Sequence, residues 1–304
     1  MASYRLLTYE SSDGPRAGIA VNKTVYDVAT LAGRPEYVSV LGILNDWESA
    51  KPILEKGAAT VGHKFGKPLA DVKLLTPILY PPTIYCAGAN YTDHVANMAR
   101  IQNIPNEPDP HELGLHPWHF IKVSRCAVAD GDPVTLISEK LDWEAELGLV
   151  IGRKMKNVPL ERALDYVAFY TIGNDLSARD MTARPHIAVQ SPFKYDWIGQ
   201  KVFDGACPLG PWLVPAAEIG DPQKLAIKLW VNDVMKQSSN TSRMIFTAAE
   251  QISHLSSRIT LYPGDVVLTG TPSGVGAETG EFLKRGDTVK ITIEKIGDLV
   301  TPIV

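Results

Sequence analysis

The chain has 304 residues, of which 45% are hydrophobic and 21% charged, and its formal net charge is −4. This composition is ordinary for a folded protein and suffices for one large and one small domain. The sequence has no basic run and no basic stripe with interleaved aromatic residues, which argues against nucleic-acid binding. It also has no 18-residue apolar run and no apolar signal core, so we expect a cytoplasmic protein without membrane association.

The first 75 residues contain no cluster of catalytic residue types, so we expect them to form a small α/β domain with a structural role, packed on the larger domain. Three prolines in segment 73–82 indicate a boundary near Thr76, which divides the chain into domains 1–75 and 76–304. Within the first domain, residues 4–9 predict a strand, 18–28 a hairpin about Asn22-Lys23, and 38–47 and 49–56 two amphipathic helices.

After this boundary, residues 83–87 predict a short apolar strand, and a helix is expected from Tyr91 to Arg100. His94 falls in the first turns of that helix, where a lone histidine is usually a surface or packed residue. Segment 101–117 is a long polar loop that carries Glu112. Because loops of this length are commonly lids or disordered segments, we interpret it as a lid, although a purely structural loop explains it nearly as well.

Segment 141–151 alternates apolar and polar residues, as a half-buried strand does. Its odd positions are apolar, so Glu144 and Glu146 are expected on the face opposite the core, with Cα atoms roughly 6.5–7 Å apart. A second apolar strand, 168–172, is followed by Asp175. Acidic residues on a wet strand face are common without a metal, but this trio offers only oxygen ligands, which suit Mg²⁺ or Mn²⁺ better than Zn²⁺.

The remainder of the chain predicts mainly short strands, so we expect an α+β, β-rich fold. Lys201 lies in a predicted loop, and the glycine-rich segment 270–280 lacks the spacing of a phosphate-binding loop, which excludes a nucleotide site. Beyond residue 226, we expect a hairpin at 227–237, a helix at 247–257 and strands at 266–268, 288–294 and 299–304.

From about Ile84 to the C-terminus, the chain resembles the fumarylacetoacetate hydrolase family in six ordered motifs. The resemblance implies a mixed β-roll or barrel-like catalytic domain with a small N-terminal domain, and commonly a homodimer. The motifs are Gly88–His94, Asp142–Leu147 with Val150–Gly152, Asn174–Asp180, Gln200–Asp204, Pro208–Trp212 and Leu268–Gly276.

The resemblance also implies an enzyme for small keto acids with a 1,3-dicarbonyl pattern, in which a divalent cation binds the keto-carboxylate end and stabilises an enolate. Residue by residue, it assigns the metal ligands to Glu144, Glu146 and Asp175, the general base to His94, a catalytic cation to Lys201, and substrate contacts to Arg179, Thr271, Tyr91 and Lys122.

The sequence departs from the family pattern near His94. The hydrolases generally carry His-x-x-Glu, whereas this chain has Asn97 at the fourth position. An asparagine can fix the histidine tautomer but cannot stabilise an imidazolium by charge, and by analogy with a catalytic triad the loss could approach ~10⁴ in rate. Either another carboxylate supplies the charge, with Glu112 the first candidate, or the reaction does not need activated water.

Three interpretations therefore remain at this level. The first is a Mg²⁺- or Mn²⁺-dependent hydrolase that cleaves a carbon–carbon bond in an acylpyruvate-like diketo acid. The second is a decarboxylase, isomerase or lyase that acts through an enolate stabilised by the same cation. The third is a catalytically silent ligand-binding member, which Asn97 alone favours. The sequence does not name the substrate tail.

Overall fold

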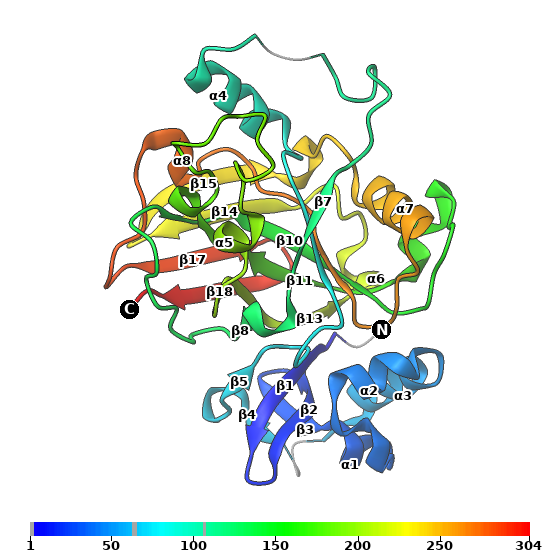
Figure 1. Ribbon diagram of the computed structural model, residues 1–304. Coiled ribbons are helices and arrows are strands. Elements are labelled where there is room, and N and C mark those ends of the chain that lie inside the picture. Colours follow the sequence, from blue (N-terminus) through cyan, green and yellow to red (C-terminus); the bar gives the residue numbers. More distant parts are fainter. Residues whose placement is uncertain (1–2, 63–65, 106–107) are drawn as a thin grey trace.

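The computed structural model describes residues 3–62, 66–105 and 108–304. Its main feature is a 12-stranded sheet that runs the length of the molecule, accompanied by a four-stranded and a two-stranded sheet. Helices are short and lie around these sheets (Figure 1). The expected α+β, β-rich class is therefore confirmed.

The N-terminal residues form the lower part of the molecule in Figure 1, where three helices lie beside one end of the large sheet. The predicted hairpin is confirmed, because Asn22 and Lys23 adopt the positive φ angles of 48° and 66° that a tight turn requires. The elements are β1 (Arg5–Ser11), β2 (Gly14–Val21), β3 (Thr24–Asp27), α1 (Val28–Ala32), the 3₁₀ turn Pro35–Val38, α2 (Val40–Asn45), α3 (Trp47–Thr60), β4 (Lys67–Pro68), the 3₁₀ turn Leu69–Asp71 and β5 (Leu74–Leu75).

This lower part joins the rest of the molecule through the sheet itself. Leu6 of β1 pairs with Leu213 of β13, so the strands continue from one part into the other. The division at residue 75 stays a prediction. The strands of the upper half of the large sheet are β6 (Ile84–Ala87), β7 (His119–Lys122), β8 (Ala127–Val128), β10 (Ala145–Ile151), β11 (Val167–Asn174), β13 (Cys207–Pro215) and β16 (Val266–Leu268).

Strand β10 lies in the middle of this half, between β11 and β16. The predicted alternation is present: Leu147 and Leu149 face one apolar core, whereas Val150 faces another. The expectation that the acidic face is wet is wrong, because Glu146 is 0% exposed. Both faces of the strand are covered, so the charged side chains of β10 need partners inside the protein.

The remaining strands form two small sheets beside the large one. The predicted hairpin at 227–237 is confirmed, with Asn232 and Asp233 at positive φ in its turn. The strands are β9 (Leu141–Asp142) with β12 (Ser177–Ala178), and β15 (Val234–Asn240), β14 (Ala226–Val231), β17 (Thr288–Ile293) and β18 (Gly297–Pro302) in that spatial order.

The helices of this half are short, and α7 begins with a capping box in which Thr247 and Glu250 satisfy each other's backbone N–H groups. The segment after Pro159, Leu160–Tyr166, forms a 3₁₀ helix. The helices are α4 (Thr92–Gln102), α5 (Trp197–Lys201), α6 (Ala216–Ile219), α7 (Ala248–Arg258) and α8 (Gly276–Thr279), with 3₁₀ turns at Ser124–Cys126, Leu160–Tyr166, Arg179–Met181 and Thr241–Arg243.

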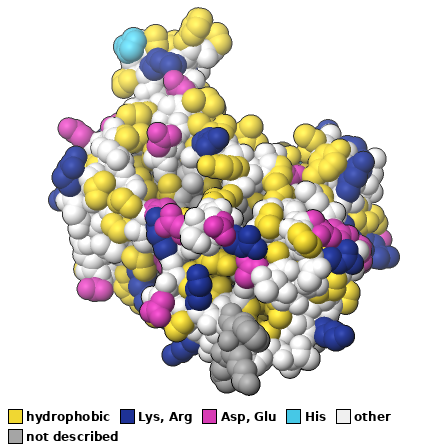
Figure 2. All heavy atoms as spheres, turned by 90° about the horizontal axis from the view of Figure 1, so that it is seen from below, with side chains coloured by type: hydrophobic (Ala, Val, Ile, Leu, Met, Phe, Trp, Pro, Cys, Tyr) yellow, Lys and Arg dark blue, Asp and Glu magenta, His cyan; other side chains and the backbone are white. Residues whose placement is uncertain are grey.

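The predicted lid follows α4 and runs over the top of the molecule in Figure 1. Residues 106 and 107 of it lie outside the described residues, and its closure on a ligand stays a prediction. Among the described residues, no helix has the length and apolarity needed to cross a bilayer. On the face seen in Figure 2, basic and acidic side chains are interspersed and form no continuous basic surface.

Asn90 connects the end of β6 to two distant segments. Its buried side chain donates to the carbonyl oxygens of Phe246 at 3.0 Å and Thr269 at 2.8 Å, and accepts from the Phe246 N–H at 2.8 Å. All three backbone groups lie in the interior, where an unmade hydrogen bond is costly.

We therefore expect Asn90→Ala to lower the free energy of unfolding by roughly 1–3 kcal/mol, because it leaves buried backbone groups without partners. Urea unfolding measures this loss. Gln102→Ala, at an exposed position of α4, is the control and should change stability by less than about 0.5 kcal/mol. A loss for Asn90→Ala as small as that of the control would contradict the assignment.

Candidate active site

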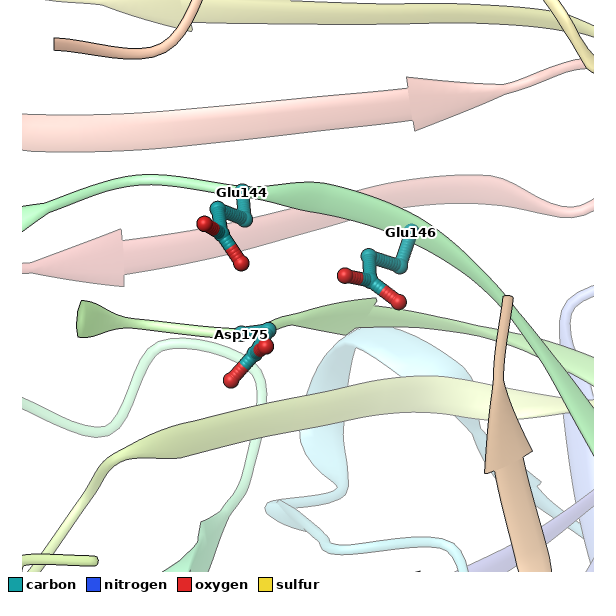
Figure 3. Close-up of side chains that lie close together, drawn as sticks. All are labelled: Glu144, Glu146 and Asp175. Atoms are coloured by element: carbon teal, nitrogen blue, oxygen red, sulfur yellow. The ribbon is translucent and has the colours of Figure 1, made fainter. Parts of the chain in front are cut away.

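Three carboxylates meet where β10 begins and β11 ends (Figure 3). Ala145 pairs with Asn174 across the two strands, and the Asp175 N–H donates to the Glu144 carbonyl oxygen at 3.0 Å. As a result, one carboxylate oxygen from each of Glu144, Glu146 and Asp175 lies within 4.8 Å of the others. The structure thus brings together the three residues that the sequence predicts as metal ligands.

Lys201 makes this arrangement of like charges tolerable. Its Nζ lies 2.9 Å from Glu144 Oε2 and 2.7 Å from Asp175 Oδ2. Burial raises the pKa of Glu144, but the charges of Lys201 and Arg179 outweigh burial and hold that pKa far below its usual range. Lys201 is buried at the end of α5, not in a surface loop as its sequence position suggested.

Lys122 lies behind the carboxylates rather than on the pocket wall. Its Nζ is 2.8 Å from Asp175 Oδ1 and donates to the carbonyl oxygens of Leu176 and Lys201 at 3.0 and 2.7 Å. These contacts orient Asp175 and the end of α5. The predicted substrate contact by Lys122 is not supported by this position, because the side chain is buried and contacts protein groups.

Tyr91 is also absent from the pocket wall. Its side chain belongs to the apolar core, and its backbone forms an isolated bridge with Met244. Burial, followed by the nearby charge of Glu146, raises the pKa of the Tyr91 hydroxyl well above its usual value. The predicted direct contact of Tyr91 with substrate is not supported by this position.

Glu146 has the least compensated carboxylate. Its Oε2 accepts from the Gly270 N–H at 2.7 Å, but its buried Oε1 has no hydrogen-bond partner among the described residues. Burial raises the pKa of Glu146 well above its usual value, and the charges of Asp175 and Glu144 raise it further. A buried carboxylate oxygen without a partner is costly, and a divalent cation with a preference for oxygen ligands would satisfy it. The residues present therefore fit Mg²⁺ or Mn²⁺.

Arg179 connects this cluster to a buried aspartate that the sequence analysis gave no role. Its Nε lies 2.9 Å from Asp142 Oδ2, and its Nη2 pairs with Glu144. Asp142 also accepts from the N–H groups of Gly276 at 2.6 Å and Ala277 at 3.0 Å. Asp142 thus holds the first turn of α8 against the carboxylate cluster.

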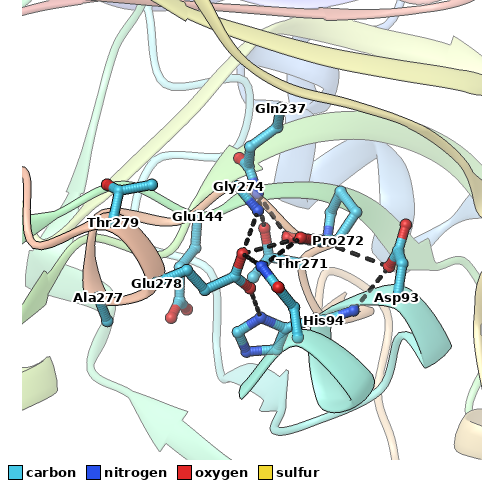
Figure 4. Close-up of polar contacts among 12 residues, drawn as sticks. Asp93, His94, Glu144, Gln237, Thr271, Pro272, Gly274, Ala277, Glu278 and Thr279 are labelled. Atoms are coloured by element: carbon cyan, nitrogen blue, oxygen red, sulfur yellow. Dashed lines mark hydrogen bonds and ion pairs between the residues drawn. The ribbon is translucent and has the colours of Figure 1, made fainter. Parts of the chain in front are cut away.

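Helix α8 carries Glu278, the partner of His94 (Figure 4). His94 Nδ1 lies 2.5 Å from Glu278 Oε1, while Glu278 Oε2 accepts from Asn97 at 2.5 Å and from Ser273 Oγ and the Gly274 N–H at 2.8 Å each. Burial raises the pKa of Glu278, but these hydrogen bonds, the one from His94 first, outweigh burial and lower it. The carboxylate next to His94 is therefore ionised at neutral pH.

The prediction that Glu112 supplies this carboxylate is wrong. Glu112 is exposed in the loop after α4, and no hydrogen bond of its side chain to His94 is present. The loop leads away from His94, because His111 fixes it to Glu250 near the start of α7 with a contact of 2.9 Å. No sequence signal pointed to Glu278, because it lies 184 positions from His94 and just after the motif that ends at Gly276.

A pocket of about 320 Å³ brings these groups together, and we call it the catalytic pocket. Thr271 lies on its wall as predicted, held by a hydrogen bond of 2.9 Å from Gln237. Gln200 also reaches the wall, and its buried Oε1 has no partner among the described residues. The full lining is Ala87, Gly88, Ala89, His94, Met98, Trp118, Phe120, Glu144, Glu146, Arg179, Thr182, Trp197, Gln200, Lys201, Thr271 and Ala277.

Comparison with known proteins agrees with this geometry. Residues 83–304 match the family model described as fumarylacetoacetate (FAA) hydrolase C-terminal. A relative from Xenopus laevis, named oxaloacetate tautomerase fahd2, mitochondrial, is 35% identical over 99% of this chain and 91% of its own length.

Two solved structures have the same fold over nearly the whole chain. The fumarylacetoacetate hydrolase of Exiguobacterium antarcticum has a TM-score of 0.79 at 27% identity, and covers 99% of both chains. The maleylpyruvate hydrolase of Sphingobium sp. SYK-6, determined with manganese (II) ion and pyruvate, has a TM-score of 0.74 at 26% identity, and covers 99% of this chain and 98% of that one.

The raised pKa of Glu146 predicts how the stability of the cation-free protein depends on pH. Its raised pKa means that the folded protein retains a proton that the unfolded chain, with a pKa of about 4.3, loses. The cation-free protein should therefore lose stability as the pH rises above about 4 and through the raised pKa. Glu146→Gln, whose amide oxygen can still accept from Gly270, should not show this loss.

Thermal melts in a chelating buffer at a series of pH values test this expectation. Glu146→Gln should melt at or above the wild type at neutral pH, and added Mn²⁺ should stabilise the wild type much more than the variant. Glu139→Gln, at an exposed position, is the matched control and should follow the wild type throughout. Strong destabilisation of Glu146→Gln in the chelating buffer would show that the carboxylate is a structural group.

Proposed function

Because the chain belongs to the fumarylacetoacetate hydrolase family, we propose that it is a divalent-cation-dependent enzyme that interconverts the keto and enol forms of a small 2-keto acid such as oxaloacetate. The observation that carries this proposal is the His94–Glu278 pair on the wall of the pocket that also contains the three carboxylates. A proton-transfer group and an anion-binding group thus share one pocket.

The anionic end of the substrate is the part for which the pocket has most partners. Glu144, Glu146 and Asp175 would hold the divalent cation, which would supply a Lewis acid for the negative charge on the keto-acid oxygens. Lys201 and Arg179 line the same pocket and add positive charge next to that end. They keep the carboxylate group oriented while the charge on the carbonyl oxygen grows.

His94 is the proton carrier in this proposal. Since its Nδ1 faces an ionised Glu278, Nδ1 carries the hydrogen and Nε2 is the basic nitrogen. Nε2 accepts the proton from the enol or from the carbon beside the carbonyl, and returns it at the other position. Glu278 stabilises the imidazolium formed between the two transfers.

Asn97 no longer argues against catalysis. Its Nδ2 donates to Glu278 at 2.5 Å, so it helps to hold the carboxylate that stabilises His94. The rate loss expected from an amide at this position does not apply, because the negative charge comes from α8 instead. This arrangement also removes the one feature that favoured a catalytically silent protein.

Hydrolysis of a carbon–carbon bond is the second candidate. The same His94–Glu278 pair can activate a water molecule, and the maleylpyruvate hydrolase with a similar fold is a hydrolase. A tautomerase returns all carbon atoms in one molecule, whereas a hydrolase releases two fragments. The homodimer, the cytoplasmic location and the choice between Mg²⁺ and Mn²⁺ stay predictions beside this proposal.

We expect His94→Ala to lower the rate of enol-to-keto conversion of oxaloacetate by about 10²–10⁴-fold with Mn²⁺ present, since it removes the proton carrier. Glu278→Gln should lower it by at least about 10²-fold, because an amide cannot stabilise the imidazolium by charge. The decay of the enol absorbance measures both rates, and chromatography of the products detects any carbon–carbon cleavage.

Glu112→Gln is the matched carboxylate-to-amide control and should retain wild-type rates, because Glu112 is exposed and away from His94. Full conversion by His94→Ala would refute its role. Cleavage of an acylpyruvate by the wild type without any conversion of oxaloacetate would instead select the hydrolase.

A further inference from the structure

A second pocket, of about 500 Å³, lies beside the catalytic pocket, and we call it the tail pocket. Helix α4 separates the two. His94 and Met98 of α4 line the catalytic pocket, whereas Thr92, Val95 and Ala96 line the tail pocket. The helical period of 3.6 residues puts these two sets on opposite faces of the helix.

Below α4 the two pockets share a wall made of Gly88, Ala89 and Trp118. The indole of Trp118 lies directly on the Gly88 backbone, because a Cβ atom at Gly88 would be only 2.0 Å from the ring. Any residue larger than glycine would push the ring away. Trp118 is 46% exposed, so rotation of its side chain is not prevented by surrounding core. The ring is thus a partition between the pockets, packed on Gly88 and partly exposed to solvent.

The side of the partition that faces the catalytic pocket is aromatic. The ring of Trp118 lies 5.9 Å from that of Phe120 and 5.8 Å from that of Trp197, and all three residues line the catalytic pocket. Lys201 Nζ lies 4.7 Å from the centroid of the Phe120 ring, so the aromatic wall begins directly beside the cationic groups. At Trp118, on the side away from Lys201, the shared wall adds only Gly88 and Ala89 and no charged side chain.

The tail pocket continues this apolar character. Asp109 is one of its two titratable residues, and its carboxylate already accepts from His111 Nδ1 at 2.8 Å. The other is His116, which stacks on His254 with ring centroids 5.1 Å apart. The remaining lining is mainly aliphatic or aromatic: Gly88, Ala89, Thr92, Val95, Ala96, Pro108, Pro110, Leu115, Trp118, Met244, Ile245 and Phe246.

We propose that the tail pocket binds the uncharged apolar tail of a 2-keto acid larger than oxaloacetate, in which an alkyl or aryl group of several carbons is attached to the keto-acid end. This inference rests on the proposed function and extends its substrate class. The keto-acid end lies at the three carboxylates, and the tail passes Trp118 into the space between α4 and the segment before α7. Pockets of this size with few polar groups are typical of sites for apolar ligands.

Binding of oxamates, which are stable mimics of 2-keto acids, tests the proposal without turnover. Titration calorimetry with Mn²⁺ compares N-methyl oxamate with N-hexyl oxamate. Each additional methylene buried in the tail pocket should tighten binding by up to about fourfold. We therefore expect the wild type to bind the hexyl compound at least about 10-fold more tightly than the methyl compound.

Val95→Trp fills the tail pocket and should reduce this ratio to less than about threefold, with the affinity for N-methyl oxamate unchanged. Ile101→Trp, on the same helix but outside both pockets, is the matched control and should retain the wild-type ratio. Ala96→Phe is a second blocking variant. Position 96 also lines the tail pocket and is exposed, so the larger side chain does not disturb the core, and the test stays valid if Val95→Trp does not fold.

The tail-pocket proposal would be overturned if the wild type bound the two oxamates equally tightly. It would also be overturned if both blocking variants kept the wild-type ratio of the two affinities. Failure of the proposed function has a different signature. A preserved hexyl preference together with no conversion of any 2-keto acid would refute the enzyme activity and leave the tail pocket supported. No binding of either oxamate would overturn both.

Discussion

The structure depends on the burial of three carboxylates next to one another where β10 begins and β11 ends. At an effective dielectric constant of about 20, two like charges roughly 4 Å apart repel by about 4 kcal/mol, so the cluster needs compensation. Lys201 supplies it by direct contact with Glu144 and Asp175. Among the described residues, the buried oxygens Glu146 Oε1 and Asp175 Oδ1 accept no hydrogen bond, and Asp175 Oδ1 has an ion pair with Lys122 whereas Glu146 Oε1 has none. This imbalance is what makes the cluster suitable for a divalent cation.

The rest of the fold positions groups around this cluster. Because β10 is in the middle of the large sheet, its side chains are fixed by strands on both sides. Asp142, just before β10, fixes α8 to this strand, because its carboxylate accepts hydrogen bonds from two backbone N–H groups of α8. Glu278 on α8 then sets the orientation of His94. The carboxylate cluster and the His94–Glu278 pair are therefore connected through Asp142 and α8. A substitution in either group should change the geometry of the other.

Sequence reasoning succeeded where the determinants are local. The period of two in segment 141–151 and a carboxylate directly after the next strand, together with the family resemblance, predicted that Glu144, Glu146 and Asp175 lie together. It failed where partners are distant in the chain: His94 and Glu278 are 184 positions apart, so the nearer Glu112 was chosen instead. It also placed Glu146 on a wet face, because alternation does not reveal that other elements cover that face.

Anomalous diffraction from crystals soaked in Mn²⁺ tests the central claim most directly. The account predicts one ion with oxygen ligands from Glu144, Glu146 and Asp175, at roughly 2.0–2.4 Å from each. It predicts that this peak is absent from Glu146→Gln crystals soaked in the same way. An anomalous peak elsewhere in the molecule, with the carboxylates of Glu144 and Asp175 still paired with their lysine and arginine partners, would contradict it.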